Sequence, residues 1–153
     1  MLIYSLIITA GVAVTVAIWT VISGPNIIGR DVPEDVKMII NGVPIQVSVA
    51  DEPYEQQRGL SGRTSLKDGR GMLFIYAEPG NYNFWMKDMH FPLDFIWLNE
   101  GRIVGITTNV TPSAYPQAFG PPEPVRYILE VNAGWAAAHN LRPGQPFYLE
   151  TLR

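Results

Sequence analysis

Residues 36–50 read VKMIINGVPIQVSVA, and this stretch decides the type of fold. Two runs rich in valine and isoleucine flank Asn41-Gly42, the strongest short-range signal for a β-hairpin. In the second run, Ile45, Val47 and Val49 alternate with polar residues, a pattern typical of a strand with one buried face. The proline inside that run favours a position at the edge of a sheet. The stretch therefore predicts an antiparallel hairpin.

The rest of the chain up to its C-terminus repeats short apolar runs separated by glycine and proline. Further strands are expected at residues 72–76, 82–86, 95–98, 103–107, 125–131 and 147–152. One short helix is expected to begin near Pro53 and end at Gly59, and a second to follow Asn132 as its cap. Five prolines between residues 108 and 124 predict a long, stiff loop, and loops of this length often carry function. These features predict a mainly β domain, either a small β-sandwich or a barrel-like fold, with one or two short helices.

The first 29 residues carry no charged side chain. At ~1.5 Å rise per residue, a helix over residues 2–22 would be about 31 Å long, which matches the ~30 Å hydrocarbon core of a bilayer. A cleaved signal peptide is the alternative, but its apolar region is usually only ~7–15 residues long. We therefore expect an uncleaved transmembrane anchor at residues 1–23, a tether at 24–35 rich in glycine and proline, and one domain at 36–153.

The orientation of this expected single-pass protein rests on its N-terminus. Charge bias near the span is weak, and short N-terminal tails usually remain in the cytoplasm. We expect the protein in the inner or plasma membrane, with the domain on the extracytoplasmic (periplasmic) side. One ridge of the span carries only small side chains, a spacing that allows another helix to approach closely in lipid. The ridge consists of Ser5, Thr9, Ala13 and Ala17. The lipid bilayer and other membrane protein subunits are therefore the expected partners.

Composition excludes several classes of function. The chain has no cysteine, which excludes disulfides, thiol nucleophiles and thiolate metal sites. Its net charge of −3 gives no electrostatic case for binding nucleic acid. No cofactor motif is present, and we expect no metal site.

Five short motifs occur in a fixed order: RGLSGR at 58–63, GMLF at 71–74, FWMKDM at 84–89, PLD at 92–94 and LEVNAG at 129–134. Together, over about residues 38–152, they resemble domain-of-unknown-function family 192. The resemblance implies a small β-sandwich domain, often exported or anchored to a bilayer, without a settled activity. Position 61 is often methionine in that family and is serine here, and the proline-rich stretch is longer than the family pattern implies.

Residues that could carry chemistry are few. Ser61 lies in a near miss for a nucleophile elbow, because the second glycine comes one residue after the serine rather than two. The two histidines, His90 and His139, would have to serve any triad or zinc site, and a solvated histidine beside a turn explains His90 equally simply. We therefore predict no catalytic residue.

Two carboxylates, Asp94 and Glu130, stand in apolar runs and could form a glycosidase pair. In the competing interpretation each carboxylate pairs with a nearby cation, because an unpaired buried carboxylate is costly. For Asp94 we expect a partner among Arg58, Arg63 and Lys87. The aromatic side chain of Trp85 beside these charges also suits a sugar or peptide. The candidate ligand-binding residues are Arg58, Arg63, Trp85, Lys87, Asp94 and Glu130.

Two functions follow from these observations. The first is a non-enzymatic, membrane-anchored accessory or scaffold subunit of a larger membrane complex, for which a respiratory or photosynthetic complex is a natural host. The alternative is an extracytoplasmic domain that binds a small ligand or carbohydrate. A concave pocket with convergent polar groups would favour the second, and a flat domain with the proline-rich loop against a neighbour would favour the first.

Overall fold

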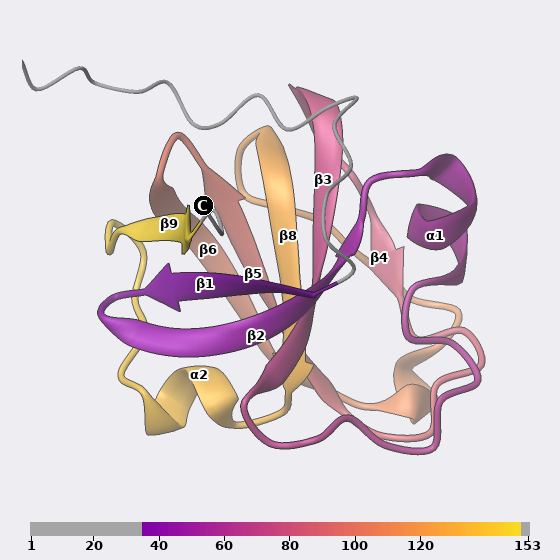
Figure 1. The fold of residues 1–153 in the computed structure, drawn as a ribbon. Coiled ribbons are helices and arrows are strands. Elements are labelled where there is room, and N and C mark those ends of the chain that lie inside the picture. Colours follow the sequence, from indigo (N-terminus) through magenta and orange to yellow (C-terminus); the bar gives the residue numbers. More distant parts are fainter. Residues whose placement is uncertain (1–34, 151–153) are drawn as a thin grey trace, which may run out of the picture.

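A computed structural model describes residues 35–150, which form a curled half-barrel of β-strands with two short helices (Figure 1). The seven-stranded sheet has the order β6-β5-β8-β3-β2-β1-β9. Its strands are β1 (Asp35–Ile40), β2 (Val43–Ala50), β3 (Arg70–Gly80), β5 (Leu93–Asn99), β6 (Arg102–Val110), β8 (Val125–Asn132) and β9 (Phe147–Glu150). Outside this sheet lie the pair β4 (Phe84–Trp85) and β7 (Ala118–Phe119), the helices α1 (Pro53–Arg58) and α2 (Trp135–Ala138), and the 3-10 turn η1 (Pro112–Ala114).

The mainly β class and the short helices are thus confirmed. The expected membrane helix, its ridge of small residues and the tether up to residue 34 lie outside the described residues. Within residues 35–150, no helix is long and apolar enough to cross a membrane.

The predicted hairpin forms as expected. Strands β1 and β2 pair antiparallel, and both turn residues, Asn41 and Gly42, have positive φ angles of 49° and 79°. Such angles are those a tight hairpin turn requires, which is why Asn-Gly is favoured there. The edge position expected for β2 is wrong, because β2 also pairs with β3, in parallel. Pro44 is tolerated because the pairing with β3 begins only at Gln46, so no ladder bond is lost on that side.

Strands β3, β5 and β8 are covered on both faces, so their alternate side chains enter two separate cores. The first, here the α2-side core, holds the buried residues Met38, Ile45, Leu73, Ile75, Ile96, Leu98, Leu129, Val131 and Ala136, among others. The second, the β4-side core, includes Leu60, Met72, Phe74, Phe84, Met86, Phe95, Trp97 and Ile128. Burial on both faces explains why these strands read as nearly continuous apolar runs in the sequence.

The proline-rich loop is a structured strap (residues 111–124) that packs against its own domain. Its backbone forms the turn η1, and its strand β7 pairs with β4, where Phe84 lies opposite Phe119. The ring of Phe119 lies 6.1 Å from that of Phe95 in the β4-side core. Contacts within the domain are therefore enough to hold the strap in this conformation.

Asp94 is completely buried, and its partners differ from the predicted ones. Its Oδ1 accepts the backbone N–H of Asn109 at 2.8 Å, and its Oδ2 accepts that of Ala136 at 3.0 Å. The second bond satisfies a donor in the first turn of α2, whose N-cap position is Gly134 rather than the expected Asn132. The predicted ion pair with Arg58, Arg63 or Lys87 is wrong. The ion pairs among residues 35–150 are Lys37–Glu150, Arg70–Asp35 and Arg102–Glu123.

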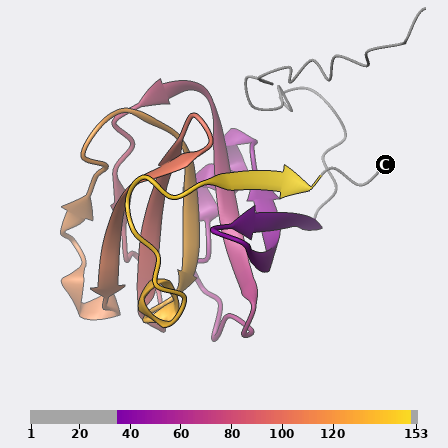
Figure 2. The same cartoon turned by 90° about the vertical axis from the view of Figure 1, so that its left-hand side faces the viewer.

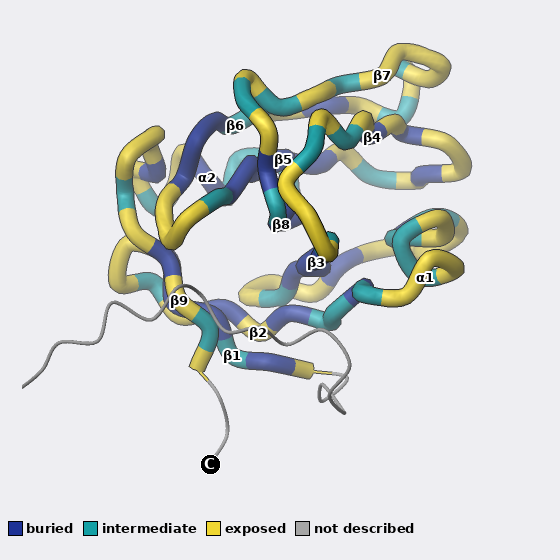
Figure 3. The backbone as a smooth tube through the Cα atoms, turned by 90° about the horizontal axis from the view of Figure 1, so that it is seen from above, coloured by how far each residue is buried: buried dark blue, intermediate teal, exposed yellow. Residues whose placement is uncertain are grey.

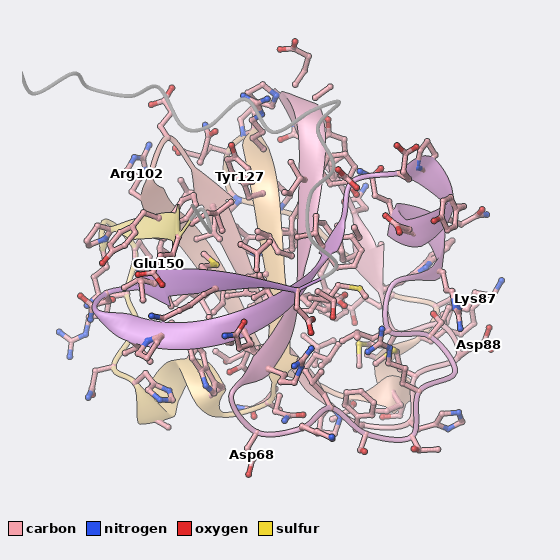
Figure 4. All side chains as sticks on the ribbon, viewed as in Figure 1. Asp68, Lys87, Asp88, Arg102, Tyr127 and Glu150 are labelled. Atoms are coloured by element: carbon pink, nitrogen blue, oxygen red, sulfur yellow. The ribbon has the colours of Figure 1, made fainter. Side chains whose placement is uncertain are left out.

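Replacing Asp94 with alanine should destabilise the domain by about 3–5 kcal/mol, because two buried N–H donors lose their acceptor. Asp94→Asn keeps one acceptor oxygen and should lose about half as much. Urea unfolding followed by tryptophan fluorescence measures both changes. Asp68→Ala, at a solvent-directed side chain, is the control (Figure 4). An Asp94→Ala variant as stable as the control would contradict the capping role.

Candidate functional site

A small cleft of about 70 Å³ opens between α1 with its following turn, β3, β4 and the buried end of β8. In the view from above, α1 and β4 lie side by side at one end of the domain, with β3 and β8 behind them (Figure 3). The residues that line the cleft are Gln56, Gln57, Arg58, Gly59, Leu60, Ser61, Phe74, Tyr76, Asn83, Phe84, Trp85, Met89 and Glu130.

Glu130 is the unusual member of this lining. Strand alternation places it on the β4-side face of the sheet, where its neighbours in register are Met72 of β3 and Phe95 of β5. Only 5% of the residue is exposed, and within residues 35–150 its Oε2 has no hydrogen-bond partner. Burial raises the pKa of Glu130 from 4.5 to about 8, although the charge of Arg63 acts in the opposite direction. The carboxyl group is therefore mainly protonated at neutral pH, because the apolar surroundings disfavour its charged form.

Gly59 closes over this carboxyl. It ends α1 with φ 51° and ψ −133°, a backbone conformation that glycine adopts and other residues avoid. A Cβ atom at this position would lie 3.2 Å from the ring of Phe74 and 4.0 Å from Oε2 of Glu130. The absence of a side chain thus leaves space beside the carboxyl at the bottom of the cleft.

Aromatic rings form the walls of the cleft. Phe74 and Phe84 meet edge to face at 4.7 Å, and Tyr76 stacks on Tyr82 at 3.5 Å. Burial, with smaller contributions from Tyr82 and Glu130, raises the pKa of Tyr76 to about 12. Trp85, which also lines the cleft, is 55% exposed to solvent. The cleft therefore combines flat aromatic rings with several polar side chains.

Two of the remaining polar side chains in the cleft donate hydrogen bonds to backbone carbonyls. Gln56 donates to the carbonyl of Ile75 at 2.8 Å, and Ser61 donates to the carbonyl of Lys87 at 2.9 Å. Neither histidine is among the residues that line the cleft, and His139 contacts the carbonyl of Trp135 at 2.9 Å. Ser61 thus has a structural role in joining two loops, and nothing around it resembles a nucleophile with its base.

The structure brings together some of the sequence-predicted residues and separates others. Arg58, Trp85 and Glu130 line one cleft, and Arg63 is close enough to act on Glu130 electrostatically. The side chain of Lys87 projects from the outer edge of the domain beside that of Asp88 (Figure 4). Asp94 lies on the opposite face of the sheet.

A glycosidase pair of Asp94 and Glu130 is therefore wrong. The β5–β8 register sets Phe95 opposite Glu130 and Asp94 opposite Val131. Because successive side chains of a strand point to opposite faces, the two carboxyls enter different cores and cannot flank one substrate bond.

Sequence reasoning missed Gly59, Tyr76 and Asn83 as lining residues. The signal for Gly59 was present, since a glycine at a helix end followed closely by a second one indicates an unusual backbone. Tyr76 ends an apolar run. Its position near the carboxyl of Glu130 depends on the pairing of β3 with β8, and the sequence does not reveal that pairing.

Comparison with known proteins places the chain in a family. The model of the DUF192 family, described as "Uncharacterized ACR", matches residues 36–148. The chain belongs to domain-of-unknown-function family 192. A crystal structure from Sinorhizobium meliloti, described as a "putative transcription regulator", is 30% identical with a TM-score of 0.69, covering 76% of this chain and 92% of that one.

A protein of unknown function from Novosphingobium aromaticivorans is 29% identical with a TM-score of 0.67, and the match covers 74% of this chain and 82% of that chain. No curated protein matches the chain. The family and its fold are thereby shown, and the resemblance read from the five motifs is confirmed.

Glu130 should make stability depend on pH. Because its pKa is raised from 4.5 to about 8, the folded state binds the proton more tightly, and stability should fall as pH rises through this range. The loss is on the order of several kcal/mol, since each pKa unit corresponds to about 1.4 kcal/mol. Glu130→Gln should remove this decline and be the more stable protein at about pH 8.5.

Chemical unfolding across this pH range measures the effect. Glu78→Gln, at an exposed position near the end of β3, is the matched control and should keep the wild-type pH profile. A wild-type stability that stays level between about pH 5 and pH 8.5 would show that Glu130 ionises without cost.

Proposed function

We propose that this protein is a non-enzymatic, membrane-anchored accessory subunit whose β domain braces the extracytoplasmic surface of a larger membrane complex. Two separate features support the proposal. One is the charge-free segment at residues 2–22 with its small-residue ridge, which suits a helix packed against another helix in lipid. The other is an exposed aromatic surface on the domain, and this observation carries the proposal.

The aromatic surface consists of Trp85 of β4 and Tyr115 of the strap. Their rings meet at 6.2 Å, nearly edge to face, and they are 55% and 47% exposed. Tryptophan and tyrosine supply much of the binding energy at protein interfaces because they bury large areas with few rotatable bonds. An exposed pair held in contact is therefore well suited to dock on a partner.

The strap presents this surface in a fixed shape. Backbone hydrogen bonds from Ala114 to Thr111 at 3.0 Å and from Gln117 to Ala114 at 2.8 Å close two successive turns around Tyr115. A surface that is already ordered loses less conformational entropy on binding. A partner would thus meet a rigid platform.

The position of the platform also suits a tethered subunit. Strands β4 and β7 lie at the opposite end of the domain from β1 and β9 (Figure 3), and the rotated view shows β7 in orange on the left and β1 in indigo on the right (Figure 2). The described part of the chain begins at β1, at the end of the domain opposite to the aromatic surface. This first strand therefore does not cover the aromatic surface. The predicted tether ahead of β1, residues 24–34, would reach at most about 40 Å if fully extended, which keeps the domain close to a membrane complex. A respiratory or photosynthetic complex is a natural host.

Ligand binding is the second candidate, and the unpartnered Oε2 of Glu130 favours it. Natural proteins rarely bury a polar atom without a hydrogen bond, and such atoms concentrate at sites that receive something from outside. The cleft, with its aromatic walls and polar floor, meets the criterion for a binding pocket stated from the sequence. The Sinorhizobium relative is described as a "putative transcription regulator", but the net charge of −3 on this chain offers no attraction for nucleic acid.

Affinity purification of the tagged full-length chain from native membranes tests the accessory role. The wild type should co-purify with other membrane subunits. The combined change Trp85→Ala and Tyr115→Ala should weaken this association, and Ala13→Leu with Ala17→Leu should release the protein in mild detergent by blocking close helix packing.

Tyr148→Ala is the matched control, since this tyrosine is 58% exposed on β9 at the other end of the domain. Circular dichroism of each variant verifies that the β domain stays folded. If the wild type migrates alone as a 17.0 kDa monomer, the accessory role is wrong and ligand binding becomes the leading function.

A further inference from the structure

The carboxyl of Glu130 is a candidate ligand contact, because its Oε2 has no hydrogen-bond partner among the described residues. Its Oε2 is shielded from solvent without a hydrogen bond, yet the residue belongs to the lining of a cleft that opens to solvent beside Trp85. A carboxyl buried only for packing would gain from replacement by an apolar residue. Its position in the lining of a cleft points to an interaction that a bound molecule completes.

The charges around the cleft decide what kind of molecule fits. Arg58 lines the cleft, and Arg63 acts on Glu130 from nearby. Neither arginine forms an ion pair within residues 35–150. The nearest carboxylate on α1, that of Glu55, already accepts the backbone N–H of Glu52 and the hydroxyl of Tyr54. A cationic ligand would meet two uncompensated guanidinium groups, whereas an anionic one would neutralise them.

We propose that the cleft binds the carboxylate group of a small molecule, and that Glu130 holds it as a protonated acid. The ligand carboxylate lies between the guanidinium of Arg58 at the mouth and the carboxyl of Glu130 at the floor. Glu130 donates its proton in a hydrogen bond to one carboxylate oxygen, and Arg58 donates N–H groups to the other. The ring or carbon skeleton of the ligand stacks on the exposed face of Trp85.

The inference rests on the second candidate function, since it names the ligand class for that cleft. It is tested separately from the accessory role, because ligand binding is measured on the purified chain and the accessory role by co-purification from membranes. Gly59 has a defined part in it: it lies beside the carboxyl without a side chain, and a Cβ atom there would stand 4.0 Å from Oε2.

Proton-linked binding is the distinguishing consequence. An ionised Glu130 would repel the ligand carboxylate, so the ligand binds the protonated form. The groups that face Glu130 are Arg63, Arg58 and the neutral hydroxyl of Tyr76, whose pKa of about 12 keeps it protonated throughout the relevant range. Affinity should therefore be level below about pH 7 and fall about tenfold per pH unit above about pH 8.

Calorimetric titration of the full-length chain in detergent micelles, with D-glucuronate as probe and D-glucose as the neutral match, tests the proposal. At about pH 6.5 glucuronate should bind at least about tenfold more tightly than glucose, and its affinity should decline at alkaline pH. Glu130→Gln should retain binding and lose the pH dependence, because the amide donates a hydrogen bond at every pH. Arg58→Met should weaken binding by at least about tenfold, and Arg142→Met, at an exposed loop position, should leave it unchanged.

Each of several results would overturn the proposal. These are equal affinity for glucose and glucuronate, loss of binding in a folded Glu130→Gln protein, or an affinity that rises with pH. Failure of glucuronate to bind at about 10 mM would do the same, since that corresponds to a binding free energy of less than about 3 kcal/mol. None of these outcomes bears on co-purification with a membrane complex, so failure here and failure of the accessory role are distinguishable.

Discussion

Because β5 and β8 are covered on both faces, every second side chain on these strands enters a core from which water is largely excluded. Each strand carries one carboxyl group into such a core, and the register sends the two to opposite faces. Asp94 accepts hydrogen bonds from two backbone N–H groups in the α2-side core, whereas Oε2 of Glu130 has no hydrogen-bond partner among the described residues of the β4-side core. The carboxyl of Asp94 therefore stabilises the fold. Glu130 has an oxygen, Oε2, that could still form a hydrogen bond but has no partner in the described domain.

The two environments have opposite consequences for the surrounding loops. Asp94 ties the start of α2 and the end of β6 to the middle of the sheet, so those connections are fixed by charge-assisted hydrogen bonds. Around Glu130 the neighbouring chain leaves space: Gly59 lacks a side chain where one would touch Phe74, and the turn after it is held from outside by Ser61 and the carbonyl of Lys87. Rigidity on one face and an open cleft on the other follow from the same alternation of side chains.

The sequence predicted the parts of this arrangement that depend on local pattern. Asn41-Gly42 predicted the hairpin. Asp94 and Glu130 could be recognised as carboxylates within apolar runs. The sequence could not place Asp94 and Glu130 on opposite faces, because that depends on the register between β5 and β8, in which Asp94 lies opposite Val131. The sequence also suggested arginine or lysine partners for Asp94, because charged side chains can be identified in a sequence. The backbone donors of Asn109 and Ala136 cannot be identified in this way. The parallel pairing of β2 with β3 was hidden for the same reason.

Trp85 joins the two proposed roles of the domain. Its indole lines the cleft over Glu130 and also meets Tyr115 on the aromatic surface. A molecule stacked in the cleft and a protein docked on the strap would both contact this one side chain. Any adjustment of Trp85 that favours one of them changes the affinity for the other, and thermodynamic linkage makes that effect reciprocal. A proton-sensitive cleft beside a docking surface would thus let local acidity alter how firmly the domain holds its partner, with Trp85 as the shared contact.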